Sequence, residues 1–176
     1  MNRTGLIRLG GLATVVGSVV FALVSLLQPW LDAMLTEVAT LPMFFLLFVV
    51  VSVAILAIMA LLRGTRHGGS GVVACGVSLV GVVLVFVGAL LGFAGFFIIL
   101  IGVLVATGGL VVLAILTTRT NALPWWSGVA LVAGGLSFVL VFYPLEDSLM
   151  GVPWAVVGFA IFRAATRQVQ QPSRVH

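Results

Sequence analysis

The sequence predicts an all-α protein, a bundle of six transmembrane helices with both termini on the cytoplasmic side. Of its 176 residues, 62% are apolar and only 7% are charged, whereas soluble domains carry about 25% charged residues. Charges separate apolar runs whose lengths suit the roughly 20 residues that a membrane-crossing helix needs. We therefore expect one transmembrane domain over residues 1–176, multi-pass in the plasma (cytoplasmic) membrane.

The first two spans are expected at about 6–27 and 42–62. Arg3 and Arg8 before the first apolar run also suit a cleaved signal peptide, which is the alternative for this segment. The run is longer than the roughly 7–15 apolar residues of such a signal, and it ends without a small-residue cleavage site. A retained first span is therefore expected. The second span lies between Glu37 and Arg63.

The third and fourth spans come from residues 71–118, which contain no charge. As a single helix this stretch would be about 72 Å long, more than twice the thickness of the bilayer core. Three glycines in the segment 88–95 lower helix stability and tolerate a tight reversal. The chain is expected to turn there, giving spans near 72–88 and 96–116.

The fifth span is expected at 125–143, between Pro124 and Pro144. The sixth is expected at 149–165, with Pro153 in its first turn, where proline is tolerated. It is short for a bilayer, so Arg163 is expected to extend its side chain toward the headgroups while the helix continues toward Arg167.

With six spans, the charges segregate completely. One side receives eight arginines: Arg3, Arg8, Arg63, Arg66, Arg119, Arg163, Arg167 and Arg174. The other side receives the four acids Asp32, Glu37, Glu146 and Asp147. The bias of arginine toward cytoplasmic loops identifies the first side as cytoplasmic. Aromatic rings suited to the headgroup level lie near the span ends at Trp30, Trp125, Trp126, Tyr143 and Trp154.

The composition also excludes several kinds of chemistry. The chain has no lysine and therefore no Schiff-base site. Cys75 is its single cysteine, and His67 and His176 lie outside the spans, so neither a disulfide nor paired haem ligands are expected. We expect no catalytic residue, no cofactor, no metal site and no nucleic-acid partner. A membrane enzyme is the third-ranked hypothesis because no acid or base lies within the spans.

Two groups of charged residues are candidate binding sites. The four acids could together form a cation site on the outer face, although solvated loop charge is the favoured interpretation because they lack a ligand-spacing motif. Arg63, Arg66, Arg163 and Arg167 are expected to contact lipid headgroups. The glycine-rich segment 63–71 could also cradle a phosphate, but it lacks the P-loop spacing, and a flexible turn is favoured.

Small residues recur at helical spacing in the pairs Gly88/Gly92 and Ala130/Gly134 and in the series Ala54, Ala57 and Ala60. Such spacing permits close helix packing, within the bundle or against another membrane protein or a second copy. Residues 11–27 also match residues 128–144 at seven of 17 positions. This similarity indicates either a repeated hairpin or shared apolar composition.

The segment Leu123-Pro124-Trp125-Trp126-Ser127-Gly128 opens a late span, and Trp154 with Gly158 leads into Arg163. In these features the chain resembles a loose group of uncharacterised polytopic prokaryotic membrane proteins that have a Leu-Pro-x-Trp-x-Gly segment before a late span. The resemblance implies an integral membrane protein and supplies no catalytic residues.

The function expected from these observations is that of a non-enzymatic accessory, assembly or membrane-organising component, with membrane lipids as partners. The alternative is a small permease or channel, suggested by hydroxyl side chains in the spans, glycine-rich helices and the possible repeat.

Overall fold

A computed structural model describes residues 3–32, 40–65, 67–140 and 148–170. These ranges contain helices and short connections. The α-helices are α1 (Arg3–Asp32), α2 (Thr40–Leu62), α3 (Gly68–Leu90), α4 (Phe96–Arg119), α5 (Trp125–Leu140) and α6 (Ser148–Gln170), and a short 3₁₀ helix, η1 (Gly92–Gly95), lies between α3 and α4. The predicted all-α class is confirmed.

Four of these helices are long and apolar enough to cross a membrane. They are α1 over Thr4–Leu27, α2 over Phe45–Leu62, α3 over Gly68–Leu90 and α4 over Phe96–Arg119. The described part of α5 has 16 residues, fewer than the roughly 20 that a crossing needs. In α6 the apolar stretch is interrupted by Arg163 and Arg167. The four long apolar helices indicate a membrane protein.

Two helices, α1 and α6, extend well past the predicted ends of their spans. α1 continues through Pro29 to Asp32, past the predicted end at residue 27. The predicted end was the end of the apolar run, but the helix itself continues further. Its 30 residues extend about 45 Å, which is longer than the bilayer core is thick. α6 passes Arg163 and continues to Gln170. The helix therefore continues beyond Arg163, as expected.

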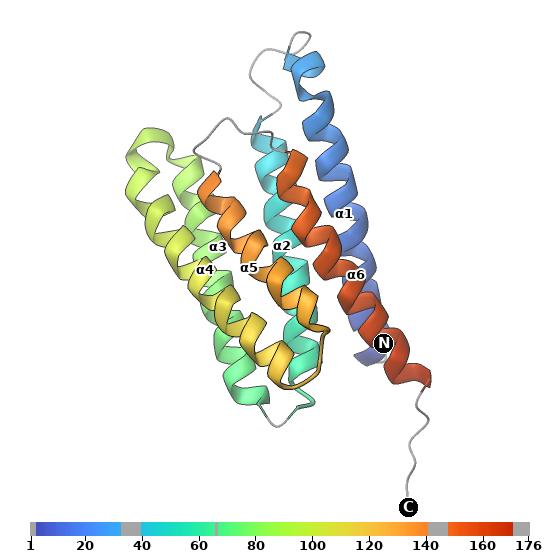
Figure 1. The fold of residues 1–176 in the computed structure, drawn as a ribbon. Coiled ribbons are helices and arrows are strands. Elements are labelled where there is room, and N and C mark those ends of the chain that lie inside the picture. Colours follow the sequence, from blue (N-terminus) through green and yellow to red (C-terminus); the bar gives the residue numbers. More distant parts are fainter. Residues whose placement is uncertain (1–2, 33–39, 66, 141–147, 171–176) are drawn as a thin grey trace, which may run out of the picture.

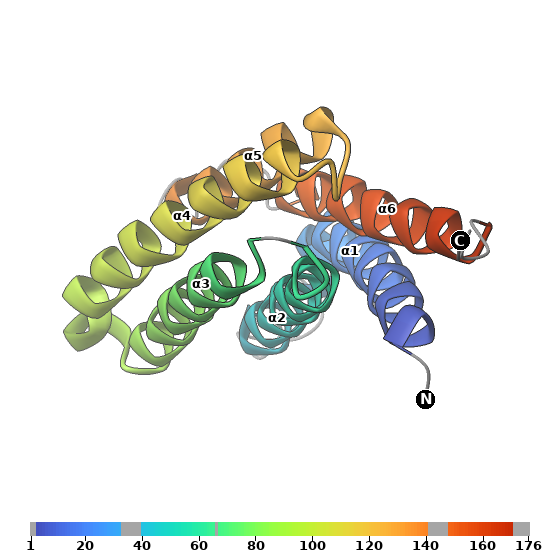
Figure 2. The ribbon, with the colours of Figure 1, turned by 90° about the horizontal axis from the view of Figure 1, so that it is seen from below.

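The helices form two layers of three (Figures 1 and 2). One layer contains α1, α2 and α3, and the other contains α4, α5 and α6. The layers meet along both edges, where α1 packs on α6 and α3 packs on α4, and these are the most extensive helix contacts. The start of α1 and the end of α6 lie at the same end of the bundle.

We call the end of the bundle that holds the start of α1 and the end of α6 the arginine end. All six described arginines lie in the helix ends and connections found there, namely Arg3, Arg8, Arg63, Arg119, Arg163 and Arg167. Arg66 and Arg174 lie outside the described residues.

The turn between α3 and α4 is at the predicted place. α3 ends at Leu90 and α4 begins at Phe96. Gly92 has a φ of +58°, a left-handed conformation that glycine adopts without the steric penalty of a Cβ atom. The uncharged segment 71–118 is therefore two helices, as its length requires.

The faces of α1 show how the bundle is arranged. Its outward face exposes Leu9, Leu12 and Val16. Its inward face buries Thr14 and Ser18, whose hydroxyls donate hydrogen bonds to the carbonyls one turn earlier, at 2.8 and 2.7 Å. Apolar side chains outside and small polar ones at helix contacts are typical of transmembrane bundles.

Glycines lie where the two layers join. A Cβ atom added to Gly11 would lie 2.7 Å from the backbone nitrogen of Phe162, and one added to Gly158 would lie 2.8 Å from that of Val15. Each glycine thus allows the backbones of α1 and α6 to approach closely. Gly92, which the sequence placed both in the turn and in a small-residue pair with Gly88, forms the turn, and a Cβ on it would meet no atom within 4 Å.

Trp154 differs from the expectation that its ring faces the headgroups. Its side chain is 0% exposed and lies against Gly134 of α5. A tryptophan near a helix start can face either the headgroups or the core of the bundle. Trp154 faces the core because Gly134 on α5 leaves space for its ring.

Candidate functional site

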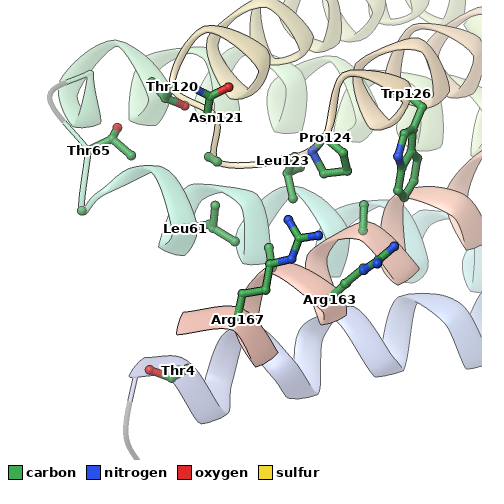
Figure 3. Close-up of a pocket in the computed structure, with 14 residues that line it drawn as sticks. Thr4, Leu61, Thr65, Thr120, Asn121, Leu123, Pro124, Trp126, Arg163 and Arg167 are labelled. Atoms are coloured by element: carbon green, nitrogen blue, oxygen red, sulfur yellow. The ribbon is translucent and has the colours of Figure 1, made fainter. Parts of the chain in front are cut away.

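A pocket of about 910 Å³ lies at the arginine end, between the two helix layers (Figure 3). Its walls come from the start of α1, the end of α2 with the connection that follows it, the connection between α4 and α5, the start of α5, and the second half of α6. Its polar side chains are Thr4, Thr65, Thr120, Asn121, Arg163 and Arg167. Pockets that bind small molecules usually have volumes of roughly 300–1,000 Å³, so this one is large enough for a ligand.

The connection between α4 and α5 has a defined geometry. Asn121 has a φ of +50°, and its backbone N–H donates to the Thr118 carbonyl at 3.1 Å. The next N–H, that of Ala122, donates to the Thr117 carbonyl at 3.0 Å. This pair of bonds around a left-handed residue is the Schellman ending of a helix, a position that asparagine tolerates. It holds Thr120 and Asn121 at the rim of the pocket.

Arg163 and Arg167 are the cations of the pocket. They are four residues apart on α6 and so lie on the same helix face. Figure 3 shows the Arg167 side chain extending from α6 toward Leu123 and the Arg163 side chain extending toward Trp126. Within the described ranges neither guanidinium has a hydrogen bond or an ion pair with protein. Asp32, the sole acid in those ranges, lies at the far end of α1.

The other two arginines predicted to contact lipid headgroups are Arg63 and Arg66, and Arg66 lies outside the described residues. Arg63 follows α2 and is exposed, but it does not line the pocket, although its neighbours Gly64 and Thr65 do. Arg8, which does not belong to the predicted set, is also outside the pocket and lies over the ring of Phe162, with 5.3 Å from its Cζ to the ring centroid. This cation–π contact joins α1 to α6. Of the four arginines predicted to contact lipid, the structure therefore brings Arg163 and Arg167 together in the pocket.

The predicted acidic cluster can be located only in part. Asp32 is the last residue of α1, while Glu37, Glu146 and Asp147 lie outside the described residues. Among the residues with described positions, no group of three or more His, Cys, Asp or Glu side chains is arranged to hold a metal ion.

The glycine-rich connection between α2 and α3 uses its hydroxyls locally. Thr65 donates to the Leu62 carbonyl at 2.8 Å, and Ser70 donates to the His67 carbonyl at 3.0 Å. Such bonds stabilise turns and helix ends. They favour the turn interpretation of this segment over a phosphate cradle.

An apolar groove of about 720 Å³ runs along the outside of α4 and α5. Ile115, Val129 and Leu136 line it, and Arg119 and Trp125 lie at its arginine end. The Trp125 side chain is 70% exposed. A cation and an amphipathic ring at the end of an apolar surface are typical of the membrane–water interface.

No protein-family model, curated protein or solved structure matches this chain. The resemblance suggested by the segment 123–128 remains a prediction. Sequence reasoning identified the two arginines of the pocket but missed Thr4, Asn121 and Trp126. These residues come from separate elements, and no spacing rule connects them.

Proposed function

We propose that this chain is a six-span protein of the plasma membrane, with both termini cytoplasmic, that acts as a non-enzymatic accessory, assembly or membrane-organising component. The observation that carries this proposal is the gathering of the six described arginines at one end of a bundle with apolar sides. Arginine at one end is the charge pattern of a cytoplasmic face next to anionic headgroups.

The use of hydroxyl groups inside the helices supports a packing role for them. Ser25 and Ser78 are buried and donate to carbonyls of their own helices at 2.9 Å. Thr107 of α4 donates to the Gly135 carbonyl of α5 at 3.1 Å, which joins two neighbouring helices. Serine and threonine in transmembrane helices commonly satisfy carbonyls in this way.

The six-span topology is testable by cysteine labelling. In a Cys75→Ala background, Ala94→Cys and Ser148→Cys are expected to react with a membrane-impermeant maleimide in intact cells. Gly69→Cys and Thr120→Cys are expected to react only after the membrane is permeabilised. The wild-type chain is a suitable blank because Cys75 is 0% exposed. Labelling of Ala94→Cys and Gly69→Cys from the same side would contradict the topology.

The alternative, a small permease or channel, is favoured by the pocket, since a transport path must open toward one face. A flux assay distinguishes the two functions. Liposomes containing the purified protein are expected to be as impermeable to Na⁺, K⁺ and protons as protein-free liposomes. Flux that disappears when Asp32, Glu37, Glu146 and Asp147 are changed to their amides would replace the accessory role with transport. Turnover of a lipid by the protein would likewise contradict a non-enzymatic function.

A further inference from the structure

We propose that the pocket at the arginine end is a binding site for a phosphate group, carried by an anionic membrane lipid or by a soluble phosphate. The chemistry begins with Arg163 and Arg167. A guanidinium presents its N–H groups as a planar fork that matches phosphate oxygens, and two such groups on one helix face can bind the same anion.

Among the described residues, nothing compensates the positive charge of the pocket. No carboxylate among the described residues lies at this end of the bundle, and neither guanidinium has a described protein partner. Arg8, in contrast, is occupied with the Phe162 ring. The pair on α6 therefore keeps its hydrogen-bonding capacity for a ligand.

Two further polar side chains have donors to offer. Thr4 and Asn121 line the pocket, and within the described ranges their side chains have no hydrogen bond. The other two hydroxyls in the pocket already donate hydrogen bonds to backbone carbonyls. Thr65 donates to the carbonyl of Leu62, and Thr120 donates to that of Leu116 at 2.7 Å. A phosphate in the pocket is thus expected to bind the arginines with help from Thr4 and Asn121.

The size and walls of the pocket indicate a ligand with an apolar part. The volume of about 910 Å³ exceeds what one phosphate ion fills. Leu61 and Leu123 are buried wall residues, and Trp126 adds an amphipathic ring. A phospholipid would place its phosphate on the arginines and its glycerol and upper acyl chains against these walls.

Binding can be measured on the full-length protein in neutral detergent, where it does not depend on topology. This inference shares with the proposed function only the lipid as partner, so cysteine labelling and ligand titration can fail separately. The probes are inorganic phosphate, sn-glycerol 3-phosphate and dihexanoyl phosphatidic acid, with dihexanoyl phosphatidylcholine as the zwitterionic comparison. Intrinsic tryptophan fluorescence is a suitable signal because Trp126 lines the pocket.

Arg163→Gln and Arg167→Gln are each expected to weaken binding of the phosphate-bearing probe at least about tenfold, the effect of losing a charge-assisted hydrogen bond. Arg63→Gln is the matched control. It removes the same charge at the same end of the bundle but outside the pocket, and its affinity should stay within about twofold of wild type.

Ala164→Phe tests the pocket without removing a charge. Ala164 lines the pocket, so a phenyl group there should exclude the ligand while both arginines remain. This variant also tests the proposal if the glutamine variants fail to fold.

Arginine-dependent binding of dihexanoyl phosphatidic acid alone would identify a lipid site, and competition by glycerol phosphate or phosphate would identify a soluble source. The proposal is overturned if no phosphate probe binds, if Arg63→Gln weakens binding as much as Arg163→Gln, or if Ala164→Phe binds as wild type does.

Discussion

Gly109→Leu is expected to lower the free energy of unfolding by about 3 kcal/mol, the upper part of the range for overpacked cores. Gly109 lies on α4 where it meets α3. A Cβ atom there would collide with the Ser78 hydroxyl and would lie 2.8 Å from the Ser78 backbone nitrogen. A side chain can rotate away from such a collision, but a helix backbone must move as a unit. The α3–α4 contact, one of the two most extensive contacts between the layers, would then have to open.

Gly108→Leu is the matched control, since it adds the same side chain one residue earlier. A Cβ atom on Gly108 meets nothing within 4 Å, and the residue is exposed. Its stability is expected to equal or slightly exceed that of wild type, because leucine is the better helix former. Both variants can be compared by far-ultraviolet circular dichroism in mixed micelles of increasing dodecyl sulfate content. Equal midpoints for the two variants would contradict the proposed role of Gly109 at the contact.

The same contact shows why the small-residue pattern was only partly predictable. Gly81 on α3, and Gly102 and Gly109 on α4, face the opposite backbone. The glycines on α4 are seven residues apart, two helical turns, which keeps them on one face. The expected spacing of four indicated the pair Gly88 and Gly92 instead. Of these, Gly88 lies against the start of α4, whereas Gly92 forms the predicted turn. Sequence spacing identifies a face that can pack, but the partner helix decides which face does.

Charges and length predicted the helices well. The absence of charge over 71–118 required a reversal, and the glycines at its centre located it, because bilayer thickness limits helix length. Successive helices run in opposite directions, and each arginine lies near a helix end or connection. The positions of the arginines along the chain therefore place them all at the same end of the bundle. The pocket was not predictable in the same way, since Thr4, Asn121 and Arg167 meet only after three different elements have packed.

Trp154→Ala is expected to lower the free energy of unfolding by about 3–5 kcal/mol, the usual cost of truncating a buried aromatic side chain. Its ring is 0% exposed and lies between α5 and α6. The control is Trp125→Ala, which removes a ring that is 70% exposed and should change stability by less than about 0.5 kcal/mol. The same mixed-micelle unfolding measurement compares the two. Similar losses from both would contradict a core role for Trp154.

A second substitution can show that the lost energy belongs to the contact between Trp154 and α5. A Cβ atom on Gly134 would lie 2.9 Å from Cε2 of the Trp154 ring, so Gly134→Val alone is expected to destabilise the protein by overpacking. In Trp154→Ala the ring is gone, and the valine side chain can occupy part of the cavity. The valine should then be neutral or stabilising. Such a change of sign is a coupling between two residues in contact; additive losses would instead show that Gly134 does not make space for the ring.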